Sequence, residues 1–159
     1  MNKKNILSSA ALLLAAAPAW AAPQTVYFNQ QGRPTENTAA IAYVREYTVQ
    51  GKHARVQDFY YPSRKKYSDP YQAPLSQIKQ FVPLLDSGTL TLWHFNGRKK
   101  MDAPYHNGKP DGVWTNWYNN GSKSAVMPYK NGKTEGIGAR YYQNGRKESE
   151  IEFHADKAN

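Results

Sequence analysis

The side chains that could do chemistry in this chain are few and do not form known catalytic or metal-binding patterns. No His-x-His, His-Glu-x-x-His or Gly-x-Ser-x-Gly motif is present, and there is no cysteine for thiol catalysis or disulfides. The acidic alternation from 148 to 152 could suggest paired carboxylates, but it is typical of one solvated strand face. We therefore expect no enzyme activity, no metal and no cofactor. The residues considered are His53, His94, His106, His154, Glu148, Glu150 and Glu152.

Binding chemistry is better represented, because aromatic residues make up 13% of the chain. Large aromatic side chains and arginine dominate protein interfaces. Four of them fall on a predicted strand face whose composition changes along the chain. We expect these four to contact a protein partner: Trp114, Tyr118, Arg140 and Tyr142.

Positive charge is spread along the chain, with a formal net charge of +9. Two basic triplets, Arg64-Lys65-Lys66 and Arg98-Lys99-Lys100, fall at or after predicted turns. Their simplest role is solubility and protection of hairpin edges. The alternative is contact with an anionic envelope surface or an acidic partner.

The first 21 residues have the layout of a secretory signal peptide. Lys3 and Lys4 precede an apolar stretch, Pro18 breaks that stretch, and Ala19-Trp20-Ala21 fits a cleavage site. Cleavage after Ala21 would remove two lysines and leave a net charge of +7. We expect a periplasmic or secreted protein with no transmembrane segment in the mature chain. Export also makes nucleic acid an unexpected partner.

A 24-residue repeat organises the second half of the chain. Segments 88–111, 112–135 and 136–159 align without gaps, and Asn-Gly pairs recur in them. Asn and Gly favour the two-residue turns of β-hairpins, in which both central residues take positive φ. The repeat predicts an all-β, elongated antiparallel meander of hairpins. Its expected structural positions are Trp93, Gly97, Gly108, Trp117, Gly121, Gly132, Tyr141 and Gly145.

Alternation along each strand separates two faces. The face that starts Thr89, Thr91, Trp93 repeats in character, so we expect it to pack. On the return strands, the expected packing face starts Met101, Ala103, Tyr105. The opposite face varies between units and is expected to carry specificity.

The first half of the mature chain is less regular. Residues 22–66 are interpreted as degenerate copies of the repeat, because segment 27–33 is similar to segment 141–146 with one insertion. An unrelated β-rich cap is the alternative. Residues 67–87 contain Pro70, Pro74 and Pro83, which argue against a central strand. This segment is expected to be a spacer before the three repeats of 88–159.

The repeats resemble the MORN-repeat variant found in bacterial proteins, including the antitoxin-like group of the YwqK type. The resemblance rests on segments 112–121 and 129–136 and covers 88–153 well and 26–66 loosely. It implies consecutive hairpins in one curved sheet, and roles in protein binding, scaffolding, membrane association or toxin neutralisation. Two features depart from this pattern. The signal peptide argues against a cytoplasmic antitoxin role, and the spacer argues against one uninterrupted sheet.

The main functional hypothesis is an exported binding or scaffold protein of the cell envelope that recognises a protein partner through the variable sheet face. An immunity protein that neutralises an exported toxin is the alternative. An envelope hydrolase would need a convergent acid/base pair, which the sequence does not display. A membrane-surface binder is the remaining hypothesis.

Overall fold

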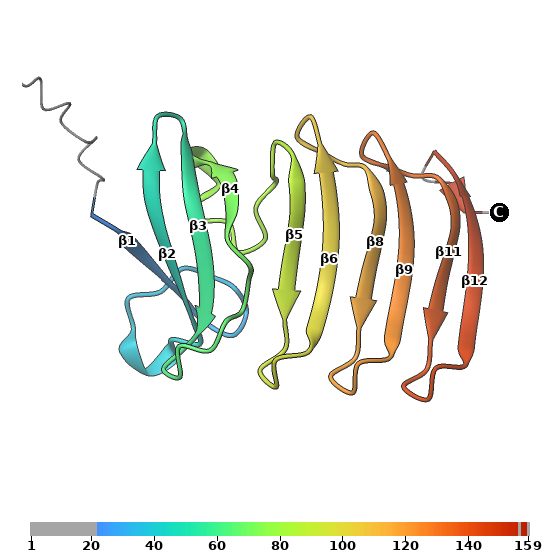
Figure 1. Ribbon diagram of the computed structural model, residues 1–159, viewed down its shortest axis with the longest axis horizontal. Coiled ribbons are helices and arrows are strands. Elements are labelled where there is room, and N and C mark those ends of the chain that lie inside the picture. Colours follow the sequence, from blue (N-terminus) through green and yellow to red (C-terminus); the bar gives the residue numbers. More distant parts are fainter. Residues whose placement is uncertain (1–21, 156, 159) are drawn as a thin grey trace, which may run out of the picture.

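The chain folds into two antiparallel sheets, which confirms the all-β prediction (Figure 1). The computed structural model describes residues 22–155, 157 and 158, and the predicted signal peptide lies outside them. The N-terminal sheet contains β1 (Gln24–Phe28), β2 (Tyr43–Gln50), β3 (His53–Tyr60) and β4 (Tyr71–Pro74), in that order. Short 3-10 helices cover Thr38–Ala40 and Leu75–Gln77.

The C-terminal sheet has the strand order β13-β12-β11-β9-β8-β6-β5, with β7 beside β6 and β10 beside β9. Its leading strands are β5 (Gly88–Trp93), β8 (Gly112–Trp117) and β11 (Gly136–Tyr141). Its return strands are β6 (Lys99–His106), β9 (Lys123–Lys130) and β12 (Lys147–His154). Its short third strands are β7 (Lys109–Pro110), β10 (Lys133–Thr134) and β13 (Lys157–Ala158).

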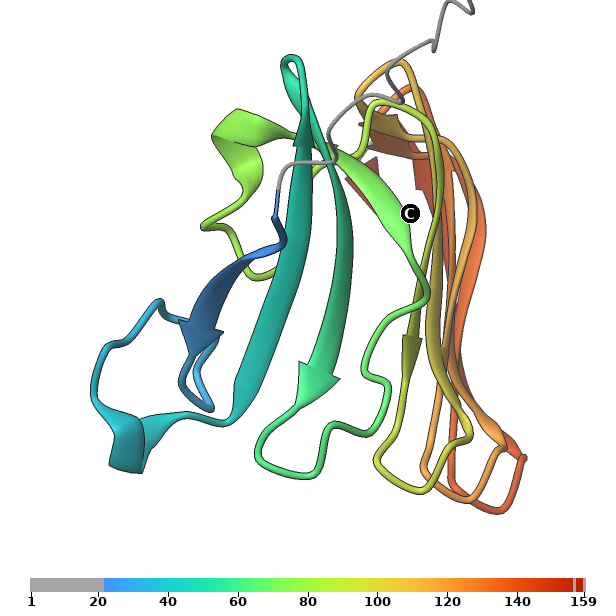
Figure 2. The same cartoon turned by 60° about the vertical axis from the view of Figure 1, so that its left-hand side comes forward.

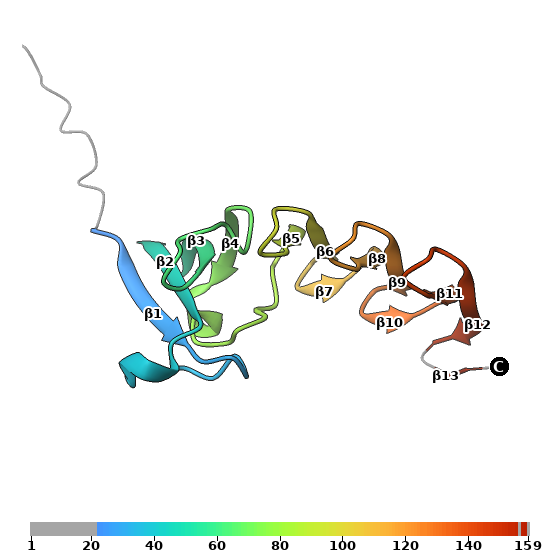
Figure 3. The same cartoon turned by 90° about the horizontal axis from the view of Figure 1, so that it is seen from below.

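Each C-terminal unit is therefore a hairpin with a small extra strand. Leading strands begin at Gly88, Gly112 and Gly136, each 24 residues after the one before. Figure 3 shows the short third strands folded beneath the main strands. The repeat pattern predicts the hairpins but not this third strand, which is only two residues long.

The Asn-Gly turns are of two kinds. At Asn107-Gly108 both residues have positive φ, 49° and 72°, as the sequence predicts, and Asn131-Gly132 is alike. At Asn96-Gly97 only the glycine has positive φ, and the asparagine carboxamide accepts the Arg98 N–H at 3.1 Å. A register shift next to each turn of this second kind absorbs the extra loop residues. The same arrangement occurs at 120–121 and 144–145.

The predicted packing face of the leading strands is wrong. Leu90 and Leu92 are 1% and 5% exposed and belong to the core, whereas Thr89 is exposed. Leu90 pairs with Ala103, and directly opposite residues of antiparallel strands share a face. The return-strand packing residues were therefore assigned to the right face and the leading-strand residues to the wrong one. We call the face of Leu90 the inner face and that of Thr89 the outer face.

A row of aromatic rings joins the units on the inner face. The Trp114 ring centroid lies 5.6 Å from that of Tyr105 and 4.9 Å from that of Tyr129. Its indole N–H donates to the Pro104 carbonyl at 3.2 Å. Because one ring touches both neighbouring strands, Trp114 packs two units against each other.

Residues 67–69 connect the two sheets. The backbone amide of Tyr67 donates to the backbone carbonyl of Asp58 in β3 at 2.9 Å. The Tyr67 carbonyl accepts from the backbone amide of Trp93 in β5 at 2.8 Å. Ser68 forms an isolated antiparallel bridge with Leu92. Figure 2 shows the two sheets alongside each other at this junction. The start of the predicted spacer thus carries backbone hydrogen bonds from one sheet to the other.

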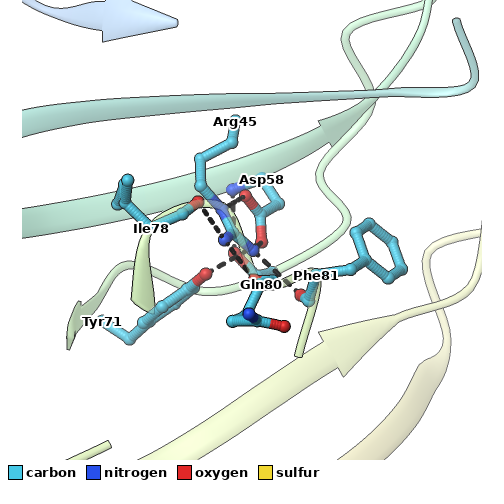
Figure 4. A network of polar contacts seen from close by, with 7 residues as sticks. Arg45, Asp58, Tyr71, Ile78, Gln80 and Phe81 are labelled. Atoms are coloured by element: carbon cyan, nitrogen blue, oxygen red, sulfur yellow. Dashed lines mark hydrogen bonds and ion pairs between the residues drawn. The ribbon is translucent and has the colours of Figure 1, made fainter. Parts of the chain in front are cut away.

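A buried ion pair holds the segment between β4 and β5 against the N-terminal sheet (Figure 4). Arg45 in β2 is fully buried and donates two hydrogen bonds to the Asp58 carboxylate, at 2.7 and 2.9 Å. Its remaining donors reach three backbone carbonyls at 2.7–2.9 Å, those of Ile78, Gln80 and Phe81. Burial alone would lower the Arg45 pKa, but hydrogen bonding and the charge of Asp58 raise it overall, so the guanidinium stays charged.

Several buried tyrosines lie in the same half of the molecule and stay neutral. Burial raises the pKa of Tyr60 to about 12, with a smaller contribution from Tyr43. Burial also raises the pKa of Tyr67 and of Tyr71, whose hydroxyl donates to Asp58 at 3.0 Å. Desolvation lowers the pKa of Lys100, whose Nζ donates to the Tyr67 hydroxyl at 3.3 Å.

Gly32 lies against Phe81, which belongs to the segment between β4 and β5, so a substitution at Gly32 measures how tightly Phe81 is packed. A Cβ at Gly32 would lie 2.7–2.9 Å from Phe81, and its φ is +72°. Gly32→Ala is expected to lower the free energy of unfolding by about 2–4 kcal/mol, from backbone strain and overpacking together. Chemical denaturation would measure it.

Gly51→Ala is the matched control, because Gly51 has a similar φ of +63° with nothing within 4 Å of the added Cβ. We expect a loss of only about 1–2 kcal/mol there. Equal losses for the two variants would show that Phe81 does not constrain Gly32.

Candidate binding surface

The outer face of the C-terminal sheet exposes apolar side chains at its centre. Val113 and Ile137 are 53% and 57% exposed. Val113 pairs with Pro128, and Val126 lies between Thr115 and Ala139 on the neighbouring strands. Strand alternation places these apolar residues on one side. We call them the outer patch: Val113, Val126, Pro128, Ile137 and Ala139.

Lysines are stacked on tryptophans at the turn ends of the leading strands β5 and β8. The Lys66 ammonium lies 3.8 Å from the Trp93 ring centroid, and that of Lys99 lies 5.4 Å from the Trp117 centroid. We call these four residues the lysine–tryptophan border. Asp102 fixes Lys99 through a 2.7 Å ion pair. Such cation–π pairs keep the lysines in place while their charge remains at the surface.

The border also contains a buried donor without a partner. Trp93 Nε1 is buried and has no hydrogen-bond partner among the described residues. Lys65 stands beside it, with its ammonium 4.1 Å from the Phe95 ring centroid. An open cavity of about 270 Å³ lies between these side chains. The border is therefore cationic and aromatic, which suits an acidic or carbonyl-rich partner surface.

The turn ends of the strands are held by side-chain hydrogen bonds from unit to unit. The Tyr60 hydroxyl donates to the Trp93 carbonyl at 2.9 Å. His94 Nε2 donates to the Trp117 carbonyl at 2.8 Å, and the Tyr118 hydroxyl donates to that of Tyr141 at 2.8 Å. These bonds fix the spacing of the surface, because each strand end is tied to its neighbour.

No protein-family model, curated protein or solved structure matches the chain. In the part of the chain that the structure describes, no helix is long and apolar enough to cross a membrane. Within residues 22–155, 157 and 158, no three His, Asp or Glu side chains are grouped so that they could hold a metal ion. What the surface can bind is therefore inferred from its own geometry.

The four residues predicted as contacts differ in how far they are exposed and in what they touch. Trp114 lies in the inner aromatic row. The Tyr118 hydroxyl donates to the Tyr141 carbonyl of the next unit. Arg140 is exposed on the inner face, between Ala125 and Ser149. Tyr142 is 50% exposed at the last turn. Trp114 and Tyr118 thus hold units together, while Arg140 and Tyr142 remain accessible.

A histidine–carboxylate pair lies elsewhere, at the far ends of the strands. His53 Nε2 is 2.5 Å from an Asp86 carboxylate oxygen, beside an open depression of about 560 Å³ that Ser76 also lines. Both side chains are about half exposed to solvent. Water screens such a pair strongly, so its geometry favours a link between the β2–β3 turn and residue 86 over general acid–base chemistry.

The outer patch and the border were not predicted from the sequence, because the predicted packing face of the leading strands is reversed. The return strands contained the information needed to assign the faces of the leading strands. Ala103 and Tyr105 were assigned to the packing side, and hairpin pairing would have placed Leu90, not Thr89, beside Ala103. That register would have exposed Val113 and Ile137.

Proposed function

We propose that this protein is an exported binding or scaffold protein of the cell envelope that recognises a protein partner through the outer patch and the lysine–tryptophan border. The exposure of Val113 and Ile137 at the centre of a regular sheet carries the proposal. Clustered apolar residues rimmed by polar ones are typical of interaction sites. The predicted signal peptide and the resemblance to MORN-type repeats support the same role.

The two parts of the surface would contribute differently to binding. Covering the exposed parts of Val113 and Ile137 would stabilise a complex by about 1 kcal/mol each. The border residues Trp93 and Trp117 present aromatic faces with stacked lysines, and aromatic anchors dominate interface energies. A partner with an apolar centre and an acidic rim fits this arrangement.

The proposal predicts that charge at the patch centre abolishes partner binding. Val113→Lys/Ile137→Lys should reduce partner recovery in affinity capture from envelope extracts by at least tenfold, because two charged side chains would replace the apolar ones that the partner covers. Quantitative mass spectrometry of the captured proteins measures the effect.

The matched control is Val82→Lys/Leu84→Lys, whose side chains are 50% and 49% exposed on a different surface. This control should capture the same partner as the wild type, and thermal unfolding should show that both variants are folded. Equal recovery by the outer-patch variant and the control would reject the proposal.

A further inference from the structure

The strand β12 has one unpaired edge, whereas the corresponding edges of β6 and β9 are paired with the next leading strand. In β6, Met101 and Asp102 pair with the next leading strand, β8. In β9, Ala125 and Val126 pair with β11 in the same way. The matching residues of β12 are Ser149 and Glu150, which pair with β11 on one side and, within the described residues, with no strand on the other.

The last turn also presents the hydrogen-bond donors that hold a following strand in the other units. The Tyr118 hydroxyl reaches the Tyr141 carbonyl at 2.8 Å, and Asn120 Nδ2 reaches the Gln143 carbonyl at 2.9 Å. One unit earlier, His94 and Asn96 make the matching bonds to the carbonyls of Trp117 and Asn119.

Tyr142 and Asn144 are the matching donors of the last unit. Asn144 Oδ1 accepts the Arg146 N–H at 3.0 Å, as Asn120 Oδ1 accepts from Ser122, so its Nδ2 is oriented as in the preceding unit. Among the described residues, neither the Tyr142 hydroxyl nor Asn144 Nδ2 has an acceptor. The edge and its two donors are thus arranged for a strand in the same position relative to β12 as β11 has relative to β9.

We propose that this edge receives an extended segment of a partner protein as an added strand, antiparallel to β12. Two of its backbone carbonyls accept from Tyr142 and Asn144, and its amide and carbonyl groups pair with residues 149–151. Backbone pairing at a sheet edge supplies affinity, while alternate side chains supply specificity. The edge adjoins the outer patch at Ile137 and Ala139, but the proposal rests on the open edge and its donors and not on the patch.

The acidic side chains of β12 determine which kind of partner segment can pair with it. Glu148, Glu150 and Glu152 alternate along the outer face of β12, and Glu150 and Glu152 lie opposite Ala139 and Ile137 of β11. Lys147 pairs with Glu150, and His154 Nε2 lies 3.6 Å from Glu152, so this face of the strand keeps more acidic than basic side chains. Opposite charges on facing strand positions stabilise a pair, and like charges destabilise it. Pairing of β12 with β12 of a second copy would place glutamates near glutamates. The added strand is therefore basic, with Lys or Arg at alternate positions.

The test uses the chain's own leading strand as a probe, because β11 fills the same position on β9. A labelled peptide of residues 136–145 carries Ile137→Lys and Ala139→Lys in one form and Ile137→Glu and Ala139→Glu in another. By analogy with Ala139 opposite Val126, these positions fall beside Glu152 and Glu150. Fluorescence anisotropy at low salt measures the Kd of each peptide for the full chain.

We expect the basic peptide to bind at least tenfold more tightly than the acidic one. Tyr142→Phe and Asn144→Ala should each weaken it about fivefold by removing one hydrogen bond. Tyr61→Phe, at another tyrosine of similar exposure, should leave the Kd unchanged. Hydrogen exchange should slow at residues 149–151 on binding.

Three results would overturn the proposal. They are equal affinity for the two peptides, an unchanged Kd in both Tyr142→Phe and Asn144→Ala, and slowed exchange at a surface other than β12. Each can be read on a folded chain, because the substituted residues lie at the end of the array and are exposed.

Discussion

Arg45→Met is expected to lower the free energy of unfolding by about 3–5 kcal/mol, which is typical when one partner of a buried ion pair is removed. The substitution leaves Asp58 buried without its countercharge. It also removes the donors of three backbone carbonyls between β4 and β5. Chemical denaturation followed by tryptophan fluorescence would measure the loss.

Arg64→Met is the control for this prediction. Arg64 also pairs with a carboxylate, that of Glu46 at 2.6 Å, but both side chains are well exposed. We expect a change of about 1 kcal/mol or less. If the two arginine variants lose similar stability, the buried network does not hold the segment as inferred. The double variant Arg45→Met/Asp58→Leu should recover part of the loss, because no unpaired charge remains.

Trp114→Ala is expected to cost on the order of 3 kcal/mol of unfolding free energy, the lower end of the range for large core aromatics, because the ring is only partly buried. The substitution removes the contacts with Tyr105 and Tyr129 that join two units. The midpoint and slope of a denaturation curve would measure the change.

Tyr142→Ala serves as the comparison, since Tyr142 is half exposed and packs against no following unit in the described chain. A change within about 0.5 kcal/mol is expected. The pair also separates folding from recognition at two residues that the sequence analysis grouped as contacts. Similar stability losses in both variants would contradict the inner aromatic row as the joint between units.

Local patterns predicted much of the C-terminal sheet. The spacing of the Asn-Gly pairs predicts the hairpins, because positive φ at a turn is a property of one or two residues. Alternation separates the two faces but does not say which face is buried. Pairing with the return strand puts Leu90 on the same face as Ala103, but whether that face is buried depends on residues of β3 and β4, which are distant in sequence.

The core of the N-terminal half could not be predicted from spacing. Arg45 and Asp58 are 13 residues apart in the chain, and the carbonyls that complete the network lie more than 30 residues from Arg45. In the sequence, Arg45 and Asp58 are indistinguishable from ordinary charged residues of a strand. Only the β2–β3 register, which places Arg45 opposite Asp58, shows that they form a pair.

The unit-to-unit hydrogen bonds from Tyr60, His94 and Tyr118 give the molecule a direction. Each donor reaches the unit that follows it, so beyond the core shared around Leu90 and Leu92 mechanical support passes along a line of units. A strand bound beside Tyr142, as proposed, would give the last described hairpin the same kind of lateral support that β11 gives to β9.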